Sequence, residues 1–342
     1  MLVIATVGPS IYEKKVLKDI IDGGADALRF NFSHGDLEGF NRTLQSAREI
    51  KKDIFLVQDL MGSKIRVSNN LSYIIKIYNG EEVIFCGEDV YRDEGYKKKF
   101  NSRKVIPLNF KSDSIVTKDI FGISMKDNTM QFDIISINEK YILTKVIRGR
   151  IVRGGKGCNL MGFDRSKIGL SEKDKADINW ALDNNISCIC QSFVEEKDDI
   201  EIVKSFVNDI DKVKKKPLIW AKIETPKGIK NIVEIANIVD GILIGRGDLI
   251  PESSIDATPI YQDEVFKKMR GIGKDLIIGT HVLNSMKNGR TAELPEVEAI
   301  YNNIKQGATG FLLAGETSVG KAPIRTVQFL RSLVDKYEKV IK

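Results

Sequence analysis

The stretch "PLIWAKIETPKG", residues 217–228, joins a short apolar run to a helix-like segment. The run Leu218, Ile219 and Trp220 is typical of a buried strand, and its period of two places Lys222 and Glu224 on one face. Two interpretations of this charged strand end stay open at this point. It is either a surface ion pair at a solvated strand end, or part of a site built where the strand meets the helix.

The same alternation of strand and helix recurs along the chain, three times before a long gap and five times after it. Eight such units are the number that closes a parallel barrel, so we expect a (β/α)8 TIM barrel in the α/β class. The apolar runs are residues 2–7, 27–33, 54–60, 187–194, 218–224, 241–248, 276–282 and 310–317.

The stretch that interrupts the alternation differs from the rest of the chain in composition and periodicity. It contains short β-branched runs broken by Gly and Asn, such as "IYNGEEVIFCG" and "KYILTKVIRGRIV", with little helical periodicity. We therefore predict a small all-β domain inserted after the third barrel strand. The expected organisation is barrel (1–62), insertion (63–159) and barrel again (160–342).

Composition narrows the setting of this fold. The chain has 342 residues, of which 42% are apolar, and a net charge of only +6, too mild to indicate a nucleic-acid partner. No apolar run approaches a membrane span, and "MLVIATVGPS" does not read as an export signal. The four cysteines lack zinc-site spacing and are expected to be buried free thiols. We expect a cytoplasmic protein without nucleic-acid or membrane partners.

Polar side chains follow most of the predicted strands. In such barrels the active site forms at the carboxyl ends of several strands at once, so these side chains would converge on one pocket. This convergence favours the site over the surface ion pair for Lys222 and Glu224. The polar ends are Arg29, Asn31, Ser33, Asp59, Ser192, Lys222, Glu224, Arg246, Gly247, Asp248, Thr280, Glu316 and Thr317.

The residue types at these ends indicate phosphoryl transfer. Glu224 and Asp248 come from neighbouring strands, and two carboxylates facing one cavity suit Mg²⁺; alternatively, Asp248 caps the following helix. Arg29 and Arg66 suit phosphate, while Gly247 allows close approach of N–H groups to a carboxylate. Such reactions depend on positioning and charge neutralisation. Because the chain has no GxxxxGK[ST] loop, a nucleotide would be held in another way.

Ten stretches resemble, in order, the signature segments of the pyruvate kinase family. The similarity runs from residue 2 to about residue 335. It implies the same barrel with a lid-like, β-barrel-like insertion, and transfer of a phosphoryl group from phosphoenolpyruvate to ADP. The stretches are "ATVGPS", "LRFNFSHG", "QDLMGSKIR", "KGCNLMG", "LSEKD", "QSFV", "AKIETPKGI", "DGILIGRGDL", "GTHVLNSM" and "GATGFLLAGET".

The resemblance also implies roles for single residues. Lys222 would stabilise the phosphoryl group in transit, with Arg29 beside it, and Thr280 would lie beside the carbon that is protonated. Glu224 and Asp248 would bind Mg²⁺ or Mn²⁺. The residues implied around the substrate are Lys222, Ser192, Gly247, Asp248 and Thr280, and those around the nucleotide are Pro9, Arg29, Asn31, His34, Arg66 and Lys156.

The family's monovalent cation site is matched by Asn31, Ser33 and Asp59. Potassium-dependent members usually carry a Thr and a Glu where this chain has Leu60 and Lys64. A lysine ammonium supplies the same single charge as K⁺, so we expect potassium independence. The alternative is that Lys64 points to solvent.

Other departures from the family pattern bear on regulation and activity. The carboxyl-terminal regulatory domain is expected to be absent, and a homo-oligomer would form through the barrel. "RGDLI" ends in Ile250 where the family usually has a glycine. This change leaves open a weakly active or inactive homologue that senses phosphoenolpyruvate or nucleotide. A carbon-carbon lyase is a more distant alternative, because such enzymes need neither the insertion nor Lys222.

Overall fold

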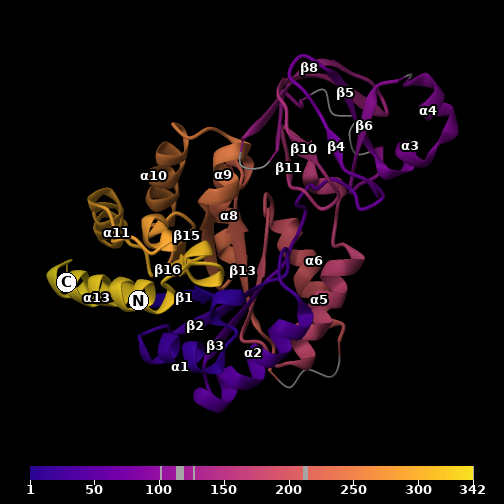
Figure 1. Cartoon of the computed structure of the whole chain (residues 1–342). Coiled ribbons are helices and arrows are strands. Elements are labelled where there is room, and N and C mark those ends of the chain that lie inside the picture. Colours follow the sequence, from indigo (N-terminus) through magenta and orange to yellow (C-terminus); the bar gives the residue numbers. More distant parts are fainter. Residues whose placement is uncertain (101, 113–118, 126–127, 211–214, 342) are drawn as a thin grey trace. The chain divides into compact units, whose positions relative to one another are not determined.

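The computed structural model describes residues 1–100, 102–112, 119–125, 128–210 and 215–341. The chain forms two compact units (Figure 1). The barrel unit comprises Met1–Gly62, Leu170–Leu249 and Asp256–Lys342, and the inserted unit comprises Ser63–Gly169 and Ile250–Ile255.

The barrel unit is a closed ring of parallel strands in the order β1-β16-β15-β14-β13-β12-β3-β2. Each of the eight predicted apolar runs forms one of these strands, so the predicted (β/α)8 barrel is confirmed. The strands are β1 (Leu2–Thr6), β2 (Ala27–Asn31), β3 (Phe55–Asp59), β12 (Cys188–Gln191), β13 (Leu218–Ile223), β14 (Gly241–Gly245), β15 (Asp275–Gly279) and β16 (Gly310–Leu313).

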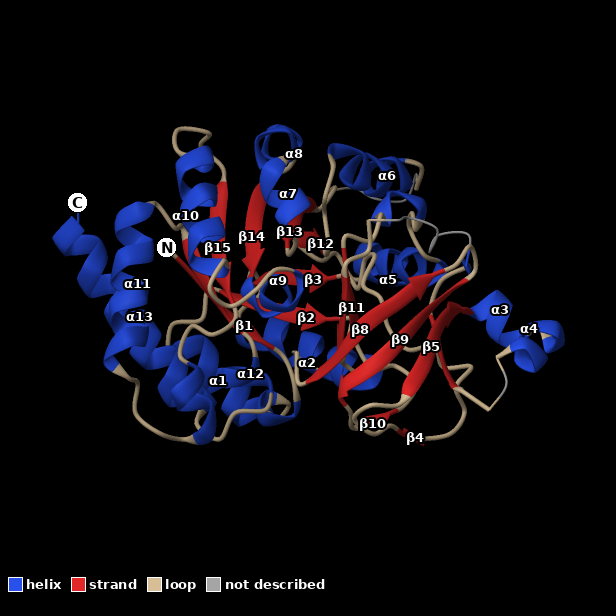
Figure 2. Cartoon of the chain, turned by 90° about the horizontal axis from the view of Figure 1, so that it is seen from above, coloured by secondary structure: helices blue, strands red, loops and turns tan. Residues whose placement is uncertain are grey.

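Helices surround the strands of this unit, as Figure 2 shows. They explain why the strands read as continuous apolar runs, since both faces of each strand are covered. The helices are α1 (Lys14–Asp22), α2 (Leu37–Ile50), α5 (Glu172–Asp183), α6 (Lys197–Asn208), α7 (Pro226–Lys230), α8 (Ile232–Ile238), α9 (Arg246–Glu252, whose last three residues belong to the inserted unit), α10 (Thr258–Met269), α11 (Leu294–Gln306), α12 (Gly315–Ser318) and α13 (Pro323–Ile341), with 3-10 turns η1 (Pro9–Ile11) and η4 (Asn284–Asn288).

Two apolar layers hold the barrel together. The outer layer lies between strands and helices and includes Phe30, Phe40 and Phe311. The inner layer fills the barrel with side chains from every strand, so its interior is packed and not a pore. Its buried members are Ile4, Ala27, Val57, Cys188, Cys190, Trp220, Leu243, Ile277 and Leu312.

All four cysteines are buried free thiols, as predicted. Cys188 and Cys190 belong to the inner layer of the barrel, where burial raises the pKa of both thiols well above the ordinary value. We therefore assign them to packing, because the reactive form of a cysteine is the thiolate.

The inserted unit is built from strands around its own apolar core. They form a six-stranded sheet, β11-β7-β8-β9-β5-β6, and a two-stranded sheet, β10-β4. The barrel-like form expected for the insertion stays a prediction. Isolated bridges at Arg66 with Gly157 and Val67 with Leu108 extend the pairing without making continuous strands. The strands are β4 (Ile75–Lys76), β5 (Glu82–Gly87), β6 (Lys104–Leu108), β7 (Gly122–Met125), β8 (Met130–Ile137), β9 (Tyr141–Arg148), β10 (Ile151–Val152) and β11 (Cys158–Met161).

The inserted unit also contains two short helices that the sequence analysis did not predict. They are α3 (Glu88–Arg92) and α4 (Glu94–Lys99). The Asp93 carboxylate caps α4 by accepting the N–H groups of Gly95 at 2.7 Å and Tyr96 at 3.3 Å. Helices of one to two turns are too short to produce a visible 3.6-residue pattern, which is why the sequence did not reveal them.

The inserted unit extends beyond the expected boundary at Asn159. It includes the 3-10 turn η3 (Arg165–Lys167) and takes in Ile250–Ile255, a segment far along the chain. Asn159 and Arg165 both donate hydrogen bonds to the buried Glu252 carboxylate, at 2.8 and 2.7 Å. These buried hydrogen bonds join the two segments. They could not be predicted from the sequence, because the segments lie far apart along the chain.

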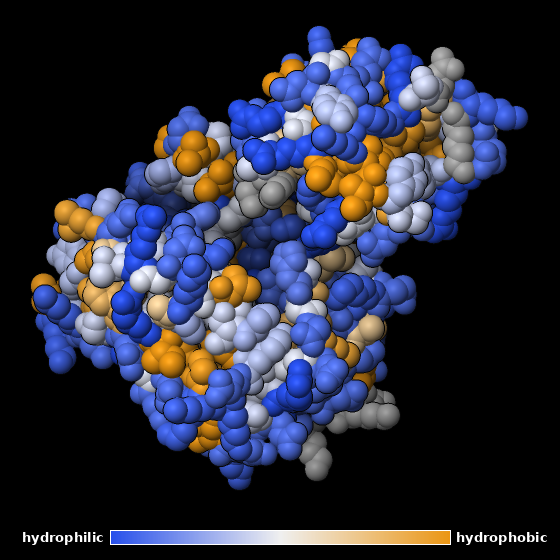
Figure 3. Space-filling view, in the orientation of Figure 1, coloured by the Kyte–Doolittle hydropathy of each residue, from blue (hydrophilic) through white to orange (hydrophobic). Residues whose placement is uncertain are grey.

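The drawn face of the molecule is largely hydrophilic, with separate apolar patches (Figure 3). Within the described part of the chain, no helix is both long and apolar enough to cross a membrane.

Candidate active site

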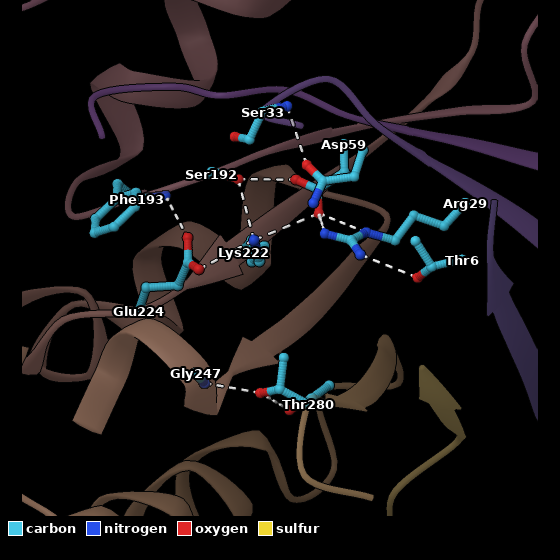
Figure 4. A network of polar contacts seen from close by, with 12 residues as sticks. Thr6, Arg29, Ser33, Asp59, Ser192, Phe193, Lys222, Glu224, Gly247 and Thr280 are labelled. Atoms are coloured by element: carbon cyan, nitrogen blue, oxygen red, sulfur yellow. Dashed lines mark hydrogen bonds and ion pairs between the residues drawn. The ribbon is translucent and has the colours of Figure 1, made fainter. Parts of the chain in front are cut away.

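Lys222 and Glu224, at the end of β13, form a buried ion pair (Figure 4). Lys222 Nζ lies 3.0 Å from Glu224 Oε1, and only 13% and 1% of the two side chains are exposed. The period of two along the strand places both on one face, as predicted. The alternative of a surface ion pair is therefore wrong, because this pair is withdrawn from water.

Asp59, the last residue of β3, connects this pair to two further strands. Its Oδ2 accepts hydrogen bonds from Arg29 Nε at 2.7 Å and Nη2 at 2.5 Å, and lies 3.4 Å from Lys222 Nζ. Ser192 Oγ donates to Oδ1 at 2.8 Å, and Arg29 Nη1 donates to Thr6 Oγ1 at 3.0 Å. The arginine fork that the sequence suggested for phosphate is thus directed at Asp59 in this structure (Figure 4).

The network fixes the charge of its members. Burial alone would lower the pKa of Lys222, but the carboxylates of Asp59 and Glu224 outweigh it and raise that pKa above its ordinary value. Burial would raise the pKa of Asp59, but Arg29, Lys222 and the Ser192 hydroxyl lower it overall. Lys222 is therefore a cation and Asp59 an anion at neutral pH.

Glu224 is held by groups that the sequence analysis did not identify. Its Oε2 accepts the N–H of Phe193 at 3.1 Å, from a backbone with φ of +55°. Gly245 of β14 lies against the carboxylate, because a Cβ atom there would come within 2.7 Å of Glu224 Oε1. Glycine at this position leaves room for the carboxylate.

Thr280 and Gly247 form a second cluster in the barrel unit. The Thr280 hydroxyl accepts the N–H of Gly247 at 2.7 Å and donates to the carbonyl of Gly279 at 2.6 Å. Asp248 is the third residue of α9, inside the first turn of the helix and not before it. Its negative charge also favours the charged form of Lys222, so Asp248 lies within electrostatic reach of the first network.

Four other predicted residues lie on the loops and strand ends of the same unit. Asn31 pairs in register with Asp59, and its Oδ1 accepts the N–H of Ser33 at 3.0 Å. Pro9 begins η1, and both Pro9 and His34 are exposed. The structure thus brings Asn31 and Ser33 beside Asp59's strand, while Pro9 and His34 face solvent.

The inserted unit contains three further predicted site residues, Lys64, Arg66 and Lys156. Arg66 Nη1 donates to the carbonyl of Gly155 at 2.9 Å. Lys156 Nζ donates to the carbonyl of Ile151, and the Lys64 carbonyl accepts from Asn109 at 3.2 Å. Their expected roles at a nucleotide or cation stay predictions.

The donor set of the barrel unit fits a hard divalent cation. Among the described residues there is no group of three or more His, Cys, Asp or Glu side chains that would enclose a metal. Mg²⁺ is instead commonly held by one or two carboxylates together with water and substrate oxygens. Glu224, set close against Gly245, and Asp248 supply oxygen ligands of this kind.

A family model described as the pyruvate kinase barrel domain matches residues 1–327. The chain belongs to the pyruvate kinase family. Among the curated relatives, the pyruvate kinase of Thermococcus litoralis is 29% identical over 341 residues, covering 98% of this chain and 69% of the relative. The pyruvate kinase of Bacillus licheniformis is 26% identical over 343 residues, covering 99% of this chain and 57% of the relative.

A solved structure agrees with the family assignment. A crystal structure of a pyruvate kinase from Cryptosporidium parvum matches with a TM-score of 0.85 at 24% identity, over 99% of this chain and 69% of that one. At this identity the match shows the fold. The chain therefore has the pyruvate kinase barrel fold and spans 57–69% of the length of these relatives.

Several contacts of this pyruvate kinase family member were not visible in its sequence. The hydrogen bonds of Thr6, Phe193 and Arg246 depend on backbone carbonyls, N–H groups and rotamers that residue types do not specify. One available signal was the glycine that ends "GILIG", since glycine at a strand end often marks close approach of another group.

Proposed function

We propose that the chain transfers the phosphoryl group of phosphoenolpyruvate to ADP, giving pyruvate and ATP. The observation that carries the proposal is the buried cation Lys222, bounded by Asp59, Glu224 and Ser192 at the carboxyl end of the barrel strands. A fixed positive group in a site withdrawn from water suits a reaction whose transition state carries concentrated negative charge.

In the first step, an oxygen of the terminal phosphate of ADP forms a bond to the phosphorus of phosphoenolpyruvate. The bond from that phosphorus to the enol oxygen breaks, and its electron pair stays on the oxygen. Lys222 stabilises the negative charge of the phosphoryl group in transit. Ser192, whose oxygen lies 3.4 Å from Lys222 Nζ, helps to orient the ammonium.

In the second step, the resulting enolate becomes pyruvate. Its oxygen becomes the carbonyl, the carbon-carbon double bond becomes single, and C3 takes up a proton that derives from water to form the new C–H bond. Thr280 lies beside C3 in this proposal, and the N–H groups of Gly247 and Asp248 hold the substrate carboxylate. The family resemblance supports these positions, and the close contact of Thr280 with Gly247 agrees with them.

Glu224 and Asp248 would hold Mg²⁺ or Mn²⁺. When bound, the ion neutralises charge on the enolate oxygen and the phosphoryl group. The proposal assigns the nucleotide to Pro9, Arg29, Asn31, His34, Arg66 and Lys156.

By the resemblance, Asn31, Ser33 and Asp59 match the family's monovalent cation site, and Lys64 is proposed to supply the charge that this cation would supply. Pyruvate formation with Mg²⁺ should then proceed equally in sodium-only and potassium buffers. Turnover only with potassium would support the proposed phosphoryl transfer and refute the proposed role of Lys64. Turnover in neither buffer, from folded protein that binds phosphoenolpyruvate, would favour a sensor and direct attention to Ile250 and Pro251 in α9.

A further inference from the structure

Thr280 has a backbone conformation that is rare for its residue type. Its φ is +62°, and that of His281 is +51°. A β-branched residue in this region is an outlier, and the conformation persists only where the surroundings of the residue impose it. The turn after β15 therefore needs an external group to hold it.

Arg246, the first residue of α9, is that group. Its Nε donates to the carbonyl oxygens of Thr280 at 3.1 Å and of Gly279 at 3.4 Å. Its Nη2 donates to the carbonyls of Thr280 and, at 3.1 Å, of His281. One guanidinium thus binds three consecutive carbonyls, a geometry that suits a planar fork and not an ammonium.

The next residue holds the same threonine from its other end. The Gly247 N–H donates to the Thr280 hydroxyl at 2.7 Å, and a Cβ atom at Gly247 would lie 3.3 Å from Thr280 Cγ2. Consecutive residues of α9 therefore fix both the carbonyl and the hydroxyl of Thr280. As a result, the direction of the hydroxyl depends on the position of Arg246.

Arg246 is itself anchored. Its Nη1 lies 3.4 Å from Gln262 Oε1 on α10, and Gln262 Nε2 donates at 2.9 Å to the buried Asn303 of α11. Burial lowers the pKa of Arg246 to about 10, with the nearby Glu316 acting in the opposite direction. Arg246 therefore stays charged at neutral pH, and its hydrogen bonds to the carbonyls are charge-assisted.

We propose that Arg246 is a positioning residue that holds Thr280 in its strained conformation and so aims the Thr280 hydroxyl at the carbon to be protonated. The catalytic part of this inference rests on the proposed function, whereas the positioning part does not.

The first test measures positioning without activity. Arg246→Lys keeps the charge and loses the fork, so amide hydrogen exchange in residues 279–283 should become at least about tenfold faster. The matched control is Arg325→Lys, because Arg325 Nη2 likewise donates to two carbonyls, of Gly289 at 2.7 Å and Arg290 at 2.6 Å. Unchanged exchange in Arg246→Lys would overturn the inference.

If Arg246→Lys does not fold, Gln262→Met takes its place. It removes the anchor of Arg246 and leaves the fork, so exchange in the same segment should rise by a smaller factor. No rise in a folded Gln262→Met protein would count against the inference.

The second test separates the two chemical steps. Exchange of the pyruvate methyl protons in D2O, with ATP and Mg²⁺, reports the reverse of C3 protonation, and it should fall about 10- to 100-fold in Arg246→Lys. ATP formation from phosphoenolpyruvate and ADP should fall less. Equal losses in both reactions would contradict a role through Thr280.

A double variant decides whether Arg246 acts through Thr280. Arg246→Lys/Thr280→Ala should exchange pyruvate protons no more slowly than Thr280→Ala alone, within about twofold, because residues that act as a unit are not additive. Multiplied losses would overturn the inference. Absence of turnover in the unsubstituted protein would instead refute the proposed function, and hydrogen exchange would still decide the positioning.

Discussion

The barrel unit and the inserted unit both bury charged side chains, but they arrange them differently. In the barrel unit, Asp59 is shared by Arg29 and Lys222, and Lys222 is shared in turn by Asp59 and Glu224. In the inserted unit, Arg165 Nη2 lies 2.7 Å from Glu252 Oε1, with 3% and 2% of the two side chains exposed.

The difference indicates what each arrangement is suited to do. Charges shared among several strands retain opposite neighbours when one contact changes, which suits a site where charged substrate arrives and leaves. The close pair of Arg165 and Glu252 links η3 to the end of α9, two segments far apart in sequence. The first arrangement is therefore suited to chemistry and the second to holding segments together.

Breaking the inserted-unit pair should have the largest effect on stability. Arg165→Met leaves the buried Glu252 charge without Arg165, so we expect a loss of about 3–5 kcal/mol in the free energy of unfolding. Urea titration followed by hydrogen exchange in the inserted unit would measure it, because the two units need not unfold together.

The matched control for that measurement is Arg103→Met. Arg103 forms an ion pair with Glu82 at 2.8 Å in the same unit, but the side chains are 40% and 43% exposed. A surface pair of this kind contributes at most about 1 kcal/mol. Equal losses in the two variants would show that burial does not distinguish the pairs.

Removing Lys222 should lower activity strongly and stability only moderately. We expect Lys222→Met to lower kcat by a factor on the order of 10² to 10³, because one preorganised positive group is lost at the transferring phosphoryl group. Its cost in unfolding free energy should be smaller than that of Arg165→Met, since Asp59 keeps Arg29 and Ser192. Steady-state kinetics and urea titration on the same variant check both statements.

Lys268→Met is the control for the loss of a lysine from the barrel unit. The Nζ of this partly buried lysine on α10 donates to the carbonyl of Ile229 at 3.0 Å, outside the proposed site. Its kcat should stay unchanged. A normal kcat in Lys222→Met would refute the role of Lys222, while a stability loss as large as that of Arg165→Met would remove the contrast between the two units.

The contrast itself could only partly be predicted from the sequence. Periodicity gave the barrel, and the rule that active sites form at strand carboxyl ends gave Asp59, Lys222 and Glu224 as a group. The direction of the Arg29 fork was not predictable, because either a carboxylate or a phosphate satisfies the same donors. The contact between Arg165 and Glu252 was not predictable, because the two residues lie 87 positions apart in the sequence.

The smallest expected effect concerns the pH dependence of the shared network. Because Asp59 has a lowered pKa in the folded protein, its ionised form stabilises the fold above the unfolded value of about 3.9, and this contribution is lost as the pH falls through the folded pKa. The difference in unfolding free energy between the unsubstituted protein and Asp59→Asn should therefore be constant from about pH 5 to 8 and shrink below about pH 4.

Lys222 gives the complementary limit at high pH. Because the pKa of Lys222 is raised in the folded protein, its protonated ammonium stabilises the fold fully below the pKa of an unfolded lysine, about 10.4. This contribution is lost as the pH rises through the pKa of Lys222 in the folded protein. Both contributions to the free energy of unfolding are therefore complete at neutral pH. Of the two, only the contribution of Asp59 changes in the measurement below about pH 4. A difference that stays constant down to about pH 3 would mean that Arg29 and Lys222 do not stabilise the Asp59 carboxylate. The charged side chains of the barrel network would then lie close together without stabilising one another.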